Sequence, residues 1–195
     1  MKERKWLRIA PTACVLLMLI LMGDQGRVGS ATVVAVLLHE SGHLLAAWLL
    51  GVRMRGLRLD LLGARLDTDG RMLSFGEEWL LAAGGPMASL LTAALAALLW
   101  TACAWARAFS CVSLVLGLLN LLPIRSFDGG RMLACSLQAV ADAKVSARVL
   151  NCTSFLALFL LWSASVYVLL RVGDGLSLFC FSLSLFLRFF DEEDF

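Results

Sequence analysis

Apolar residues along this chain come in long runs, and most of the charged residues are collected between the runs. Several of these runs approach the length of about 20 residues with which a helix crosses a bilayer. The pattern predicts an all-α polytopic membrane protein with about six transmembrane helices. We expect them at about residues 7–22, 30–50, 79–105, 109–123, 150–170 and 176–190.

The hydrophobic period changes between the second and third predicted helices. Leu57, Leu59 and Leu61 alternate with charged residues, which is the two-residue period of a strand. Gly63 can turn the chain, and residues 64–70 can return it. We therefore predict a small β-hairpin at the cytoplasmic membrane surface, which either caps the core or offers a strand edge to an extended peptide.

Residues 127–150 have the pattern of a short amphipathic helix between the fourth and fifth predicted spans. The sequence contains no internal repeat and no low-complexity linker. We therefore expect one membrane-embedded domain over residues 1–195, with a core at about 30–133 and flanking helices before and after it.

Composition agrees with a membrane protein and excludes an ordinary soluble domain, because 60% of the residues are hydrophobic. The six cysteines form no C-x-x-C pair and mostly lie in apolar runs, so we expect free buried thiols. The net charge is only +2, and we expect the lipid bilayer and no nucleic acid among the partners.

The distribution of positive charges predicts the orientation in the membrane. With six spans and a cytoplasmic amino terminus, nearly all lysines and arginines face the cytoplasm, as the positive-inside rule requires. The exceptions on the outer side are Arg27, Arg107 and Arg171. Both termini are therefore expected in the cytoplasm.

The second predicted helix contains ionisable residues where burial is costly. His39 and His43 are four residues apart, so they share one helix face, and Glu40 follows the first histidine. This H-E-x-x-H spacing suits two imidazole ligands on one Zn²⁺, with Glu40 as the general base for a water molecule. The alternative is a pair of histidines that hydrogen-bond between helices, but ionisable residues inside a bilayer are usually functional.

A catalytic zinc needs a third protein ligand, and the chain has no other histidine. Asp128 follows an apolar run and precedes two glycines, and beside an incomplete zinc site we favour it as that ligand. By itself the Asp-Gly pair would indicate a plain turn. Glu77 and Glu78 are an alternative source, although acids are also common in the first turn of a helix.

The motif H-E-x-x-H, followed later by N-x-x-P-x-x-x-x-D-G, resembles the site-2 protease family of intramembrane zinc metalloproteases. The second motif comprises Asn120, Pro123, Asp128 and Gly129. The resemblance implies that Asp128 is the third zinc ligand. It also implies that Asn120 lines the site and contacts the substrate or the oxyanion, while Pro123 and Gly129 have structural roles.

The stretch "AAGGPMASLL" is similar to the glycine-proline element of the same family. The resemblance implies that Gly85 allows close helix approach and that Pro86 loosens the backbone. Gly42, within the H-E-x-x-H motif, is expected to have a structural role as well.

The arrangement of helices is closest to the bacterial sporulation branch, which processes a membrane-tethered sigma-factor precursor. The resemblance therefore implies a zinc endopeptidase of the bacterial cytoplasmic membrane, with one Zn²⁺ per chain. A membrane-tethered protein substrate and a membrane-embedded regulator are the expected partners. The alternatives are an inactive homologue that binds membrane helices and, less favoured with only two histidines, a metal transporter.

Overall fold

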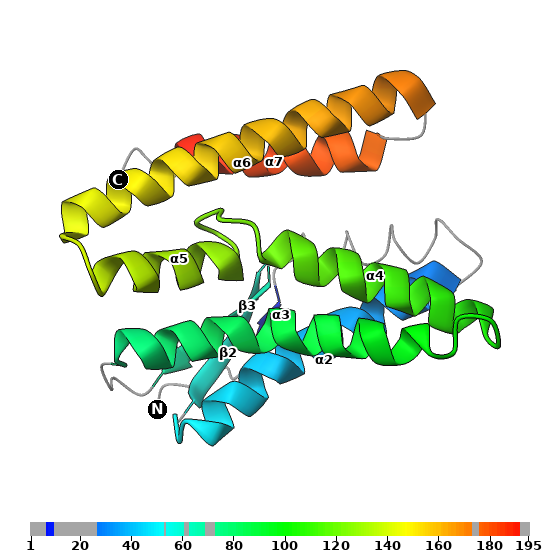
Figure 1. Cartoon of the computed structure of the whole chain (residues 1–195), viewed down its shortest axis with the longest axis horizontal. Coiled ribbons are helices and arrows are strands. Elements are labelled where there is room, and N and C mark those ends of the chain that lie inside the picture. Colours follow the sequence, from blue (N-terminus) through cyan, green and yellow to red (C-terminus); the bar gives the residue numbers. More distant parts are fainter. Residues whose placement is uncertain are drawn as a thin grey trace.

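A computed structural model describes residues 7–9, 27–52, 54–60, 63–68, 73–172 and 176–191. The helices are α2 (Arg27–Leu49), α3 (Phe75–Ala97), α4 (Ala104–Asn120), α5 (Asp128–Gln138), α6 (Ala143–Val172) and α7 (Leu176–Asp191). The strands are β1 (Leu7–Ile9), β2 (Met54–Asp60) and β3 (Gly63–Thr68). The fold is thus mainly helical, with a small sheet between α2 and α3 in the sequence (Figure 1).

The sheet lies where the alternating pattern predicts a hairpin. β2 and β3 pair antiparallel, with Leu57 opposite Leu66, and β1 pairs parallel to β2, with Leu7 opposite Leu57. The first helix was expected to begin at residue 7, and this is wrong for Leu7–Ile9, because the edge of β2 provides these residues with strand partners. The rest of that predicted helix, residues 10–22, lies outside the described residues.

Three predicted helix boundaries are wrong near the centre of the chain. The third predicted helix was expected to reach residue 105, but α3 ends at Ala97. The fourth was expected to begin at residue 109, but α4 begins at Ala104. Between the two helices, backbone hydrogen bonds join residues three positions apart, as in a 3₁₀ turn. The Leu99 N–H donates to the Ala96 carbonyl at 3.0 Å, and the Trp100 N–H donates to the Ala97 carbonyl at 3.1 Å. The fourth helix also ends before Pro123, which cannot continue a helix ladder.

Three described helices are long and apolar enough to cross a membrane: α2, α3 and most of α6. Two shorter apolar helices are α4 and residues 178–187 of α7. Large apolar side chains on these helices, such as Leu37, Leu91 and Leu170, point outward and are more than half exposed. They suit contact with lipid, and the total of six spans stays a prediction.

Helices α2, α3 and α4 pack against one another, and α5 lies between α3 and the paired helices α6 and α7 (Figure 1). The contact of α2 with α3 is unusually close. A Cβ atom at Gly42 would overlap the Gly84 carbonyl and would lie 2.6 Å from the Ala88 Cβ. Small residues allow such backbone contact between membrane helices, and they place the motif face of α2 directly against α3.

This packing predicts that Gly42→Ala destabilises the protein, because the added methyl group must displace backbone rather than a mobile side chain. We expect a loss of about 1–3 kcal/mol, the usual cost of overpacking. Gly76→Ala is the matched control, since a Cβ atom there would meet nothing within 4 Å. Thermal unfolding of the purified protein in detergent measures both, and equal unfolding temperatures for the two variants would contradict the close contact.

Candidate metal centre

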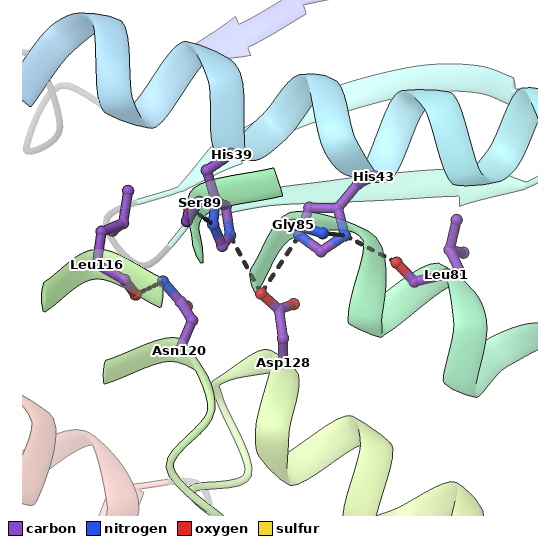
Figure 2. Close-up of polar contacts among 8 residues, drawn as sticks. All are labelled: His39, His43, Leu81, Gly85, Ser89, Leu116, Asn120 and Asp128. Atoms are coloured by element: carbon purple, nitrogen blue, oxygen red, sulfur yellow. Dashed lines mark hydrogen bonds and ion pairs between the residues drawn. The ribbon is translucent and has the colours of Figure 1, made fainter. Parts of the chain in front are cut away.

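Two imidazoles from α2 and one carboxylate from α5 converge at the centre of the helical core (Figure 2). The Nε2 atoms of His39 and His43 lie 3.2 and 3.3 Å from the same oxygen, Oδ2 of Asp128. The three residues are 4, 6 and 9% exposed, respectively. The structure therefore brings together the three side chains that the two motifs single out, and Figure 2 shows all of them turned toward one point.

The spacing of these atoms fits a single metal ion. With bonds of about 2.0–2.1 Å from a tetrahedral zinc, neighbouring ligand atoms are separated by about 3.3 Å. Two imidazole nitrogens and one carboxylate oxygen are also the donors of a catalytic zinc site that keeps its fourth position open. Among the residues that the structure describes, this is the one group of His, Cys, Asp and Glu side chains suited to a metal ion.

Polar atoms of α3 orient both imidazole rings. Nδ1 of His43 lies 2.8 Å from the Leu81 carbonyl and 3.3 Å from the Gly85 backbone nitrogen. Because the carbonyl can only accept and is the closer partner, we assign the proton to Nδ1, which leaves the Nε2 lone pair for a metal ion. Nδ1 of His39 lies 2.9 Å from Oγ of Ser89, which can accept in the same way. Such partners fix the tautomer and the ring orientation of metal-binding histidines.

The glycine-proline element of α3 forms the surface behind the rings. A Cβ atom at Gly85 would overlap the His43 ring and lie 2.7 Å from Nε2 of His39, so only glycine fits here. Pro86 lies inside α3 and is fully buried. Because proline lacks an N–H group, it removes one backbone bond from the helix at this point.

Asp128 is the first residue of α5, where the partial positive charge of a helix amino terminus favours a carboxylate. Its Oδ2 atom faces both Nε2 atoms, where it would be the third ligand beside the two imidazoles. Gly129 follows it in direct contact with the Leu121 carbonyl, where a Cβ atom would overlap.

Two further motif residues lie near the cluster. Glu40 is half-buried on α2, in the turn between the two histidines. Asn120 is half-buried at the end of α4, and its side-chain N–H group donates to the Leu116 carbonyl of its own helix at 3.0 Å (Figure 2). The role of Asn120 at the site stays a prediction.

The alternative third ligands have other partners. Glu77 forms a capping box with Ser74 at the start of α3, and Oε2 of Glu78 accepts a weak hydrogen bond from Sγ of Cys135 at 3.5 Å. Burial, together with Glu78, raises the pKa of the Cys135 thiol to about 11. Neither glutamate belongs to the cluster, which favours Asp128 over both.

Sequence reasoning missed the groups that hold the rings, namely the Leu81 carbonyl and the Ser89 hydroxyl. A usable signal was present, because Leu81, Gly85 and Ser89 recur every four residues and so share one face of α3. A backbone carbonyl that bonds a side chain, however, leaves no trace in residue type.

The bond to His39 predicts that Ser89→Ala weakens zinc binding roughly 10- to 100-fold, the usual effect of removing a partner of a ligand. Ser110→Ala is the control, since the Ser110 hydroxyl is buried in the same helix bundle but donates to the Ala93 carbonyl instead. Competition with a calibrated zinc chelator gives both affinities. Parent-like binding by the Ser89 variant would show that this bond does not support the ligand.

Similarity to known proteins extends over most of the chain. A site-2 protease from Methanocaldococcus jannaschii has a similar structure, with a TM-score of 0.64 over 95% of this chain and 89% of that chain. The two sequences are 20% identical, so this likeness establishes a shared fold. No curated protein sequence matches the chain. The Peptidase M50B-like family model matches residues 12–186, which is most of the chain, and the protein therefore belongs to this peptidase family.

Proposed function

We propose that this protein is an intramembrane zinc-dependent endopeptidase that hydrolyses peptide bonds in or near the membrane segments of tethered proteins. The observation that carries the proposal is the buried cluster of His39, His43 and Asp128. Both imidazole nitrogens lie 3.2–3.3 Å from the carboxylate oxygen, close to the separation of neighbouring ligands in a tetrahedral zinc site. Membership of a peptidase family supplies the reaction class.

The bound zinc would supply a water molecule that is nucleophilic near neutral pH, and it would polarise the scissile carbonyl. Glu40 lies on the same helix as both histidines, so it can accept the proton of the attacking water. The same carboxyl can then deliver that proton to the leaving amine. Burial of the cluster limits bulk water around these groups, which strengthens each electrostatic contact during the reaction.

Asn120 offers an amide close to the carboxyl end of α4 and only eight residues before Asp128. Its N–H group now donates to Leu116 within its own helix. A rotation about the side-chain bonds would free this donor for the substrate backbone or for the oxyanion of the tetrahedral intermediate. The Leu116 carbonyl would keep the bond from its usual helix partner.

The apolar helices and the family support a membrane location and a membrane-tethered substrate. The long apolar helices support a location of the site within a bilayer, and the positive charges favour cytoplasmic termini in a bacterial cytoplasmic membrane. The described sheet has the order β1-β2-β3, so an unwound substrate segment can add to the outer edge of β3. A membrane-tethered sigma-factor precursor and a membrane-embedded regulator are the partners we propose.

The proposed mechanism predicts that Glu40→Gln lowers peptide hydrolysis roughly 10²- to 10⁴-fold, the usual contribution of a general base. Zinc content should stay at the parent level, because Glu40 is not among the clustered donors. Quantitative proteomics of membranes expressing the parent or the variant would reveal an uncleaved protein that accumulates only with Glu40→Gln.

Glu78→Gln is the control for this experiment, since it makes the same chemical change at an exposed position outside the cluster. It should process the accumulated protein as the parent does. A Glu40→Gln variant that cleaves this protein at the parent rate would exclude hydrolysis by this site and favour a helix-binding role.

A further inference from the structure

The connection between α4 and α5, residues 121–127, leads directly into Asp128. It also packs directly against the first turn of α5, because a Cβ atom at Gly130 would overlap the Ile124 carbonyl. The start of α5 therefore rests on the backbone of this connection. Any shift of the connection moves the Asp128 carboxylate relative to α2.

A single buried hydroxyl from α6 holds this connection. Ser154 is 0% exposed, and its Oγ accepts a hydrogen bond from the Arg125 backbone N–H at 3.0 Å. The same hydroxyl donates to the Pro123 carbonyl at 3.2 Å. It thus binds the backbone on both sides of Ile124 and satisfies one donor and one acceptor that the turn leaves unpaired.

Apolar packing supports the same contact. Ile124 and Phe127 are 3 and 5% exposed, and they pack with Leu158 of α6 and Leu185 of α7. Leu158 lies one turn after Ser154, on the same face of α6. Packing of this kind tolerates small shifts of the chain, whereas the two directed bonds of the Ser154 hydroxyl fix its register.

We infer that Ser154 is a positioning residue of the metal centre. It holds the 123–125 turn so that the Asp128 carboxylate lies within ligand distance of the Nε2 atoms of His39 and His43. The inference rests on the proposed function, because it assigns Ser154 to the same metal-binding site. It makes α6 part of the site, although α6 contributes no ligand to the cluster.

The test compares zinc affinity and stability for Ser154→Ala and Ser165→Ala in detergent. Ser165 is also 0% exposed on α6, but its hydroxyl pairs with Oγ of Ser182 on α7 at 2.8 Å, away from the connection. Chelator competition should show roughly tenfold weaker zinc binding for Ser154→Ala, at the lower end of the losses caused by removing supporting groups. Ser165→Ala should bind zinc as the parent does, whatever its unfolding temperature in zinc-free buffer.

Asp128→Ala, measured beside these variants, separates the positioning role of Ser154 from the existence of the metal centre itself. If it loses zinc while Ser154→Ala keeps parent affinity, the positioning role is overturned and the metal centre stands. If Asp128→Ala itself binds zinc as the parent does, the proposed function is overturned. Should Ser154→Ala fail to fold, Ser154→Cys keeps the shape with a weaker donor and acceptor, and parent affinity in that variant overturns the inference.

Discussion

The structure depends on one buried contact, in which a single carboxylate oxygen of Asp128 meets the Nε2 atoms of His39 and His43. Burying a charge and two imidazoles inside apolar helices is costly unless they are paired or bind a metal. The close packing of α2 on α3 and the glycine at position 85 serve this contact, because larger residues would push the rings away.

The contact is supported from two opposite sides by elements that provide no ligand. On one side α3 holds the rings through the Leu81 carbonyl and the Ser89 hydroxyl. On the other side α6 holds the connection before Asp128 through Ser154. A site assembled from α2 and α5 is therefore kept in register by α3 and α6, so its geometry belongs to the whole bundle.

The sequence predicts the parts of this arrangement that depend on local spacing. The four-residue separation of the histidines and the Asp-Gly pair indicated the cluster, and alternation indicated the strands. The break after Ala97 escaped prediction, because an apolar stretch without Gly or Pro contains no stop signal. The supporting role of Ser154 also escaped, because a contact between residues 31 positions apart depends on the tertiary fold.

The most direct test of the central claim is X-ray absorption spectroscopy at the zinc edge of the purified protein. The account predicts one zinc per chain with two imidazole nitrogens and one carboxylate oxygen, at distances of about 2.0–2.2 Å. The imidazole and oxygen signals should weaken in His43→Ala and Asp128→Ala, respectively. A spectrum with sulfur ligands at about 2.3 Å, or a protein that binds no zinc, would contradict it.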